Sequence, residues 1–559
     1  MAFRNTLLTA ALATSGVLAG GYSGGGPTAI IDAGVVIGTT TSLPAATASV
    51  NKFLGVPFAK SPPTRFAPPE DPGTFSKPIQ AKAWKPACIQ QFNYPLAAYE
   101  FTNLVYNSAH PKESEDCLYL NVYAPSTPAP ADGRAVLYWI YGGALQFGTA
   151  GQLQYDGSAF AAYEDVIVVT VNYRTNVFGF PSSPALPSDG HNLGFLDQRA
   201  GLDWVQNNIH AFGGSSSKVT IFGESAGSWS VDALLTSFPA GSSPPFRGAI
   251  TQSGTISYPG SFSFQNPVPS WNKLATALKC SGSDAAILEC VRAAPAKKIQ
   301  KIIDTQALSF DPTPDNITLV SNPAERRKSG NIAHVPVLGG SNSQEGRSLA
   351  VGQNDTTAFL QAVGITDETF TETVLAAYPL GDGTAYDQIA QIFTEIAFQC
   401  PQALVSNDTA NAGIPAWRYY FNASFANLQA YPGLGVYHAS EIPLVFSTYP
   451  VANATTQEYA LSTFMRGAWA RFAKNPAGGP GWNAVGTGAA GQVLVGATQL
   501  ELGGLYLDGA GEVEEGTWDL GVLGNRGEVM GAGVTVVDQA ELDYRCGLWA
   551  PLYALGVFG

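Results

Sequence analysis

Charged residues are scarce in this sequence, and positive charge is scarcer than negative charge. Aspartate, glutamate, lysine and arginine make up 13% of the 559 residues, whereas hydrophobic residues make up 45%, which is typical of a globular protein. Only 29 lysine and arginine residues oppose 43 aspartate and glutamate residues, so the net charge is −14 at pH 7. This balance argues against a basic surface that would bind nucleic acid or anionic membranes.

Long apolar runs and paired cysteine motifs are also missing. After the first 19 residues, no stretch reaches the roughly 18 consecutive apolar residues of a membrane-spanning helix. The C-terminal LWAPLYALGVFG is apolar but short, and it lacks the polar spacer of a lipid-anchor signal. We therefore predict no stable membrane anchor. The absence of a C-x-x-C pattern removes the usual sign of a metal site built on cysteine pairs.

The N-terminus and the cysteines favour a secreted protein. Arg4 precedes an apolar stretch rich in alanine, which predicts a signal peptide over residues 1–19, the alternative being a helix retained in the mature chain. In an oxidising compartment the even number of cysteines makes disulfides the default, with the connectivity left open by sequence alone. Glycosylation sequons, which suit an extracellular chain, start at Asn316, Asn354, Asn407, Asn422 and Asn453.

Short apolar runs predict an α/β fold. They are AVLYWIYG from Ala135, VIVVTVNY from Val166, KVTIFG from Lys218, RGAITQSG from Arg247 and VPVLGGS from Val335. Strands that are apolar on both faces belong in a parallel sheet covered by helices. Between the second and third runs, Leu202, Val205 and Ile209 are spaced for an amphipathic helix, as a βαβ crossover requires.

We expect a single domain over residues 20–559. Two segments near 256–333 and 347–415 interrupt the alternation with helix-like patterns, and we interpret them as insertions over the C-terminal edge of the sheet. The glycine-rich stretch 478–533 predicts loops and short strands at the periphery.

The stretch FGESAGS contains the best candidate for a nucleophile. Ser225 follows an apolar run and precedes AGSWSVDALLTS, which can form a helix. A strand, a G-x-S-x-G turn and a helix together present a serine hydroxyl at the edge of a sheet. Gly223 and Gly227 omit the Cβ atoms that would clash in so tight a turn. Without the strand before it, an ordinary glycine-rich turn would explain the pattern equally well.

A nucleophilic serine needs a general base, and the sequence has few histidines. Of His110, His191, His210, His334 and His438, only the last two follow Ser225, as the base does in hydrolases with this turn. His334 enters an apolar strand, where a structural role is expected, whereas His438 lies in a loop flanked by glycine. Glu345 follows the strand that starts at Val335, and Gly346 after it permits a sharp turn, so we expect Glu345 to orient His438.

Backbone amides are predicted to stabilise negative charge on the reacting oxygen. In WIYGGALQFG, the small residues Gly142, Gly143 and Ala144 let amides approach a substrate closely. The amide of Ala226, at the start of the helix after Ser225, points into the same space. A glycine pair after a strand is also a common turn, so this prediction depends on the other parts.

Two longer motifs identify a family. FGGSSSKVTIFGESAG, residues 212–227, and EDCLYLNVYAP, residues 115–125, are similar to the two signatures of the type B carboxylesterases and lipases. That family includes cholinesterases and many secreted fungal esterases. FLGVPFAKSPPTRFAPPE, QSG and RCGLW also resemble family segments, so the resemblance covers residues from about 30 to 550.

The resemblance implies the α/β-hydrolase fold and a set of site residues. It implies a triad of Ser225, Glu345 and His438, with an oxyanion hole formed by the amides of Gly143, Ala144 and Ala226. It also implies that Glu224 and Ser253 support the triad without reacting with the substrate, and that Arg65 pairs with Glu115. The implied disulfides are Cys88–Cys117, Cys280–Cys290 and Cys400–Cys546. The resemblance implies neither a metal nor an organic cofactor.

Two departures from the family pattern bear on the substrate. Ala144 stands where a third glycine is common in the family. We expect its methyl group to narrow the part of the substrate site that holds the acyl group. Cholinesterases carry a tryptophan about ten residues before the cysteine of the second signature, and this chain reads YNSAHPKESEDC there. The missing platform for a quaternary ammonium predicts that choline esters are not preferred substrates.

The sequence therefore predicts a secreted serine hydrolase of small-molecule or lipid esters that works through an acyl-enzyme. One alternative is a lipase for long-chain acylglycerols, because segment 89–116 mixes apolar and polar residues where lipases of this family place a mobile lid. The other is a non-catalytic adhesion or binding module of the same fold. The sequence leaves the oligomeric state open.

Overall fold

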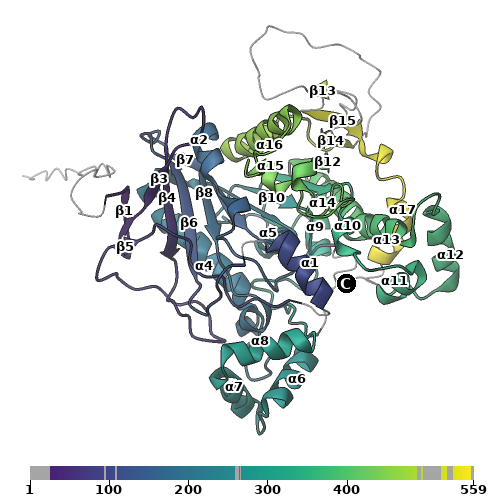
Figure 1. The fold of residues 1–559 in the computed structure, drawn as a ribbon, viewed down its shortest axis with the longest axis horizontal. Helices are drawn as coiled ribbons and strands as arrows, with labels where there is room; N and C mark the ends of the chain where they lie inside the picture. The colour runs from purple at the N-terminus through teal and green to yellow at the C-terminus, as the bar shows by residue number, and fades with distance from the viewer. Residues whose placement is uncertain are drawn as a thin grey trace, which may run out of the picture.

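The computed structural model describes residues 25–92, 96–107, 110–258, 264, 266–486, 493–494, 518–524 and 533–554. The predicted signal peptide, residues 1–19, lies outside this part of the chain. Within it, strands form one 12-stranded sheet and a separate 3-stranded sheet, and helices flank the larger one (Figure 1). The chain thus has the α/β architecture that the apolar runs predict.

The predicted strands form the middle of the sheet. They are β7 (Arg134–Ile140), β8 (Ile167–Val171), β9 (Gly214–Glu224), β10 (Gly248–Gln252) and β11 (Val337–Asn342). The other members are β3 (Thr39–Thr41), β4 (Val50–Pro57), β6 (Tyr119–Pro125), β12 (Ala416–Asn422), β13 (Val493–Leu494), β14 (Asp519–Gly524) and β15 (Val534–Asp538). The small sheet consists of β1 (Thr28–Ile31), β2 (Gly34–Ile37) and β5 (Ile79–Gln80).

The sheet is parallel in its middle and antiparallel at both edges. The strand order is β13-β15-β14-β12-β11-β10-β9-β7-β8-β6-β4-β3, and every pair from β14 to β8 is parallel. The pairs toward β3 and toward β13 are antiparallel. Strands β7, β8, β10 and β11 are buried along their whole length, and β9 is buried from Val219 to Glu224, so these strands are mostly apolar on both faces. Their carboxyl ends meet at one edge, where the site lies.

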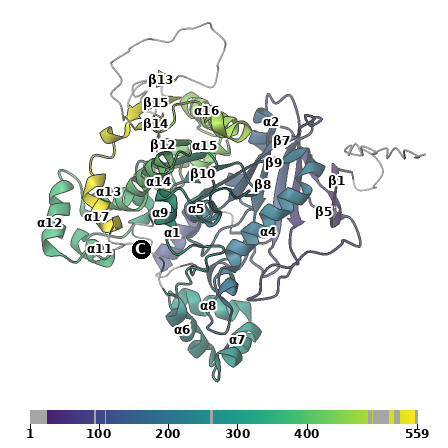
Figure 2. The same cartoon turned by 180° about the vertical axis from the view of Figure 1, so that it is seen from behind.

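Helices cover both faces of the sheet. On one face, α5 (Ala226–Ser237), α9 (Pro323–Lys328) and α14 (Cys400–Asn411) lie together, and Figure 2 shows α4 (Leu193–Asn208) crossing the sheet. The other face carries α2 (Ser158–Glu164), α15 (Ile442–Val445) and α16 (Thr456–Lys474). Two adjacent residues of β10 show the alternation: Thr251 lies beside Gln402 of α14, whereas Gln252 accepts a hydrogen bond from Trp469 of α16.

The two interrupting segments are helical. In the first, α6 (Val268–Leu278), α7 (Asp284–Ala293) and α8 (Ala296–Thr305) pack together below the sheet in Figure 1. The second contains α10 (Gly346–Leu349), α11 (Thr356–Ala362), α12 (Glu368–Ala377), α13 (Ala385–Thr394) and a π-helical turn, η5 (Glu395–Gln399). These helices form a second hydrophobic core with α17 (Cys546–Ala554), to which α10 contributes only the partly buried Leu349. The segment ends in α14, the helix of the crossover from β11 to β12.

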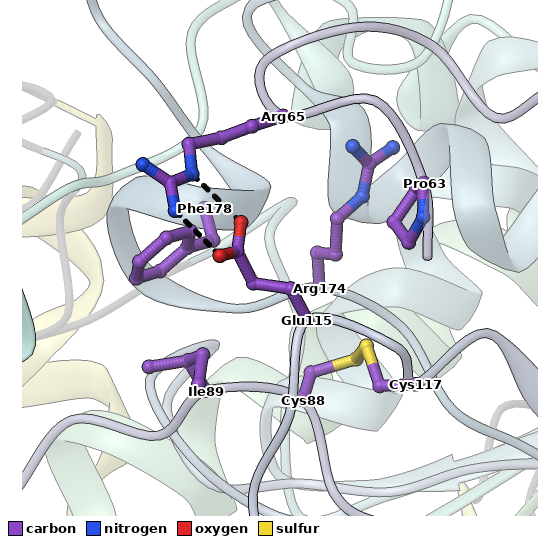
Figure 3. Close-up of a pocket in the computed structure, with 8 residues that line it drawn as sticks. All are labelled: Pro63, Arg65, Cys88, Ile89, Glu115, Cys117, Arg174 and Phe178. Carbon is purple, nitrogen blue, oxygen red and sulfur yellow. Dashed lines mark hydrogen bonds and ion pairs between the residues drawn. A yellow bond between two sulfur atoms is a disulfide. The ribbon is translucent and has the colours of Figure 1, made fainter. Parts of the chain in front are cut away.

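All six cysteines are paired as the family resemblance implies. The disulfides join Cys88 to Cys117, Cys280 to Cys290 and Cys400 to Cys546, so this prediction is confirmed. Figure 3 shows the first of them below the predicted ion pair, in which the Arg65 guanidinium donates to both carboxylate oxygens of Glu115 at 2.7 and 2.5 Å. None of the helices in the described residues is long and apolar enough to cross a membrane.

Candidate active site

Ser225 occupies a strained turn between β9 and α5. Its backbone angles are φ 57° and ψ −124°, a conformation that a non-glycine residue adopts only where the surroundings impose it. Its amide donates to the carbonyl of Gln252 at 2.8 Å. A Cβ atom on Gly227 would lie 2.0 Å from the carbonyl oxygen of Ile140, and one on Gly223 would lie 2.6 Å from the backbone of Gly227. Both glycines are therefore required by close approach, as the motif predicts.

His438 and Glu345 lie together at the same edge of the sheet. Oε2 of Glu345 lies 2.7 Å from Nδ1 of His438, and its Oε1 accepts the backbone N–H of Asn342 at 2.6 Å. Both side chains are buried. Gly346 is required for a reason that the sequence does not reveal: its φ is not positive, but a Cβ atom there would lie 2.1 Å from the carbonyl oxygen of Ala390 in α13.

The other ring nitrogen of His438 faces the turn that carries Ser225. Nε2 lies 3.2 Å from Oε1 of Glu224, the residue before Ser225 in the chain, although the two atoms are not aligned for a hydrogen bond. The imidazole therefore lies between the carboxylate of Glu345 and the Ser225 turn. His334, in contrast, is exposed, and its Nε2 pairs with the carbonyl of Gly330 at 2.8 Å.

The loop of residues 142–148, which we call the oxyanion loop, contacts the Ser225 turn directly. A Cβ atom on Gly142 would come within 2.8 Å of the Cβ of Ser225. Gly143, Ala144 and Leu145 have φ values of 103°, 53° and 57°, and none of the amides of Gly143, Ala144 and Ala226 meets an acceptor among the described residues. Amides left without an internal partner beside a serine can bind an oxyanion.

Carboxylates control the protonation of the imidazole. Burial alone would lower the pKa of His438, but the negative charges of Glu224 and Glu345 outweigh it and hold that pKa above its ordinary value of about 6.5. Burial raises the pKa of Glu224 above the usual range of a carboxyl group, and the charge of His438 opposes this shift only in part. Glu441, also buried, is the smallest of the three contributors to the pKa of His438.

Replacing Glu224 with glutamine is expected to move the acid limb of the pH–rate profile to lower pH. An imidazole can act as a base only when neutral, and removing a nearby negative charge lowers the pKa of His438, so we expect activity to persist further into the acid range. The measurement is kcat/KM between about pH 5 and about pH 10. Glu441→Gln is the matched control and should shift the limb less. If the acid limb of the kcat/KM profile of Glu224→Gln stays in place or moves to higher pH, this electrostatic account is contradicted.

The structure adds residues that the sequence analysis does not name. Phe398, in the π-helical turn, lies with its ring centroid 4.8 Å from that of His438, and the ring of Tyr106 lies edge-on at 6.4 Å. Tyr106 comes from the stretch that lacks the tryptophan of cholinesterases, so an aromatic ring does reach the imidazole from there. A π-helical turn often marks a functional site. Only the apolar character of Phe398 is visible in the sequence.

Ser253 and the predicted lid segment also lie near the site. Ser253, with φ 53°, donates its amide to Gly340 at 2.8 Å, and its buried hydroxyl meets no partner in the described part of the chain. Segment 89–116 contains α1 (Leu96–Tyr106). The Tyr106 hydroxyl donates to the hydroxyl of Ser348 at 2.6 Å, which connects the end of α1 to α10 beside Glu345.

Comparison with known proteins identifies the family of this chain. A sequence profile described as the Carboxylesterase family matches residues 26–501. Relatives include an acetylcholinesterase of Bungarus fasciatus, 33% identical over 78% of this chain and 76% of the relative, and the liver carboxylesterase 1F of Rattus norvegicus, 31% identical over 79% and 84%. A cocaine esterase of Homo sapiens is 33% identical over 81% of this chain and 84% of its own length.

Proposed function

The chain belongs to the carboxylesterase family and is a carboxylic ester hydrolase, and from this premise we propose that Ser225, His438 and Glu345 carry the reaction. The observation that carries the proposal is the 2.7 Å contact between Glu345 and Nδ1 of a histidine whose Nε2 faces the Ser225 turn. In this arrangement Glu345 fixes the tautomer that leaves Nε2 free to accept a proton.

The reaction follows from these positions. Oγ of Ser225 attacks the carbonyl carbon of the ester while Nε2 of His438 takes the hydroxyl proton. The amides of Gly143, Ala144 and Ala226 stabilise the negative oxygen of the tetrahedral intermediate. The bond to the alcohol breaks as His438 returns the proton to the leaving oxygen, which gives the acyl-enzyme. Water, deprotonated by His438, then attacks the acyl group, and the carboxylic acid leaves with Ser225 restored.

A fluorophosphonate probe tests the proposed nucleophile. The probe should label the protein in one-to-one ratio, and mass spectrometry of the digested protein should place the adduct on the peptide that contains Ser225. Prior incubation with a hydrolysable aryl ester should slow the labelling. Adduct formation on another serine, or no adduct at all, refutes the assignment of Ser225 as the nucleophile.

Secretion belongs to the same proposal and is supported by the three disulfides, which form and persist in oxidising compartments. We expect the sequons to differ in occupancy. Asn316, Asn354 and Asn453 are exposed, whereas Asn407 and Asn422 are half-buried, and the carboxamide oxygen of Asn407, on α14, is buried.

Glycans are therefore expected on Asn316, Asn354 and Asn453, because an oligosaccharide needs a carboxamide that reaches solvent. The measurement is enzymatic deglycosylation in heavy-oxygen water, followed by peptide mass spectrometry of protein secreted from a eukaryotic host. Asn407 and Asn422 serve as internal controls and should keep unmodified side chains. Modification confined to those two residues would contradict the prediction.

A further inference from the structure

The segment 88–92, which we call the strap, lies against the oxyanion loop. The carboxamide oxygen of Gln90 accepts the amide of Gly148 at 2.8 Å, and the amide of Gln91 donates to the carbonyl of Gln146 at 2.9 Å. The ring of Phe92 stacks on that of Phe147 with 5.3 Å between centroids. The strap therefore contacts the last three residues of the loop with two hydrogen bonds and one aromatic pair.

The strap is itself fixed to the body of the protein. Cys88 begins it with a disulfide to Cys117, and Figure 3 shows Ile89 directly beyond this bridge. The Gln91 carboxamide donates to the carbonyls of Ile303 and Leu308 at 3.2 and 2.7 Å, and the amide of Phe92 donates to Asp304 at 3.1 Å. These contacts join the strap to the end of α8.

The oxyanion loop needs such support because its backbone is strained. Gly143, Ala144, Leu145 and Gly148 all have positive φ values, and two of them are not glycine. Such conformations persist only where the surrounding structure imposes them. Gln90 supplies the one side-chain acceptor at Gly148 among the described residues, and its own side chain is 1% exposed.

We infer that Gln90 is a positioning residue for ester hydrolysis, which sets the place of the oxyanion-loop amides by accepting the amide of Gly148. This inference rests on the proposed role of the Gly143 and Ala144 amides. A donor acts chiefly when the substrate oxygen gains negative charge, so displacing it lowers kcat and leaves ground-state binding almost unchanged.

The test is Gln90→Met, which keeps the length of the side chain and removes the acceptor. We expect kcat for an aryl ester to fall at least about tenfold, with KM changed less than about threefold. The rate of phosphonylation at Ser225 should fall by the same factor, because it also develops charge on an oxygen. Gln198→Met is the control: Gln198 is equally buried, and its carboxamide donates to Ser230 of α5 at 2.9 Å and has no hydrogen bond to the oxyanion loop among the described residues.

Two outcomes overturn the inference: a wild-type kcat in Gln90→Met, or an equal loss of kcat in Gln198→Met. Should Gln90→Met fail to fold, Phe92→Leu removes the stacking on Phe147 and is expected to lower kcat roughly threefold with unchanged KM. Ser225→Ala separates the two proposals. If Ser225→Ala is inactive while Gln90→Met and Phe92→Leu keep the wild-type kcat, the positioning role of the strap is refuted and the assignment of Ser225 as the nucleophile is retained. An active Ser225→Ala refutes the proposed function itself.

Discussion

Replacing Ser225 with alanine is expected to lower kcat for a simple aryl ester by about a million-fold, the loss seen when a catalytic serine is removed from a complete triad. The hydroxyl is the atom that would become acylated, and no other group in the turn takes its place. The strained turn should persist, because Gly223 and Gly227 fit their surroundings independently of the hydroxyl. The residual rate comes from the amides and from substrate binding.

The measurement is steady-state hydrolysis of a p-nitrophenyl ester, with thermal unfolding measured in parallel. Ser230→Ala is the matched control, since Ser230 lies on the same helix and its buried hydroxyl donates to the carbonyl of Ala226 at 3.0 Å. This control should keep kcat near the wild-type value. A Ser225→Ala protein that is correctly folded and turns over at a near-normal rate is incompatible with the proposed mechanism.

Glu345→Gln is expected to lower kcat by about ten-thousandfold near neutral pH. The amide oxygen of the new glutamine can still accept the N–H of Asn342, so its NH₂ group faces Nδ1 of His438. Nδ1 then becomes an acceptor, and the ring proton moves to Nε2, where it blocks the removal of the Ser225 proton. The substitution therefore traps the histidine in the wrong tautomer with little change in shape.

Stopped-flow or steady-state kinetics at several pH values check this prediction. Glu458→Gln is the control, because Glu458 is equally buried but its carboxylate accepts from Asn427 at 2.9 Å near the start of α16. The control should affect the free energy of unfolding and leave kcat unchanged. A Glu345→Gln protein within about tenfold of the wild-type kcat would mean that Glu345 does not orient the imidazole.

Local patterns explain why much of the fold could be predicted. The apolar runs match β7 to β11 because a strand that helices cover on both faces has mostly apolar residues on each of them. Helix α5 coincides with AGSWSVDALLTS, and the spacing of Gly223 and Gly227 around Ser225 reflects clashes within a few residues. His438 could be singled out only because the sequence offers so few histidines after the serine.

Contacts between distant segments could not be predicted. The disulfide pairing required the family resemblance, since spacing alone leaves it open. The need for glycine at position 346 depends on Ala390 in another helix. Phe398 reaches His438 because a π-helical turn shifts the register between α13 and α14, and no residue pattern announces that shift. The bond between Gln90 and Gly148 likewise spans a sequence separation of 58 residues.

The bridge between Cys88 and Cys117 bears on the choice of expression host. Disulfides do not persist in a reducing bacterial cytoplasm, so protein produced there would lack the Cys88–Cys117 bond. The strap that begins at Cys88 and contacts the oxyanion loop would then lose one of its attachments to the body of the protein. A preparation of such protein can be abundant and monodisperse and still contain few molecules that hydrolyse esters. Active-site titration, rather than soluble yield, is therefore the appropriate standard for comparing recombinant preparations.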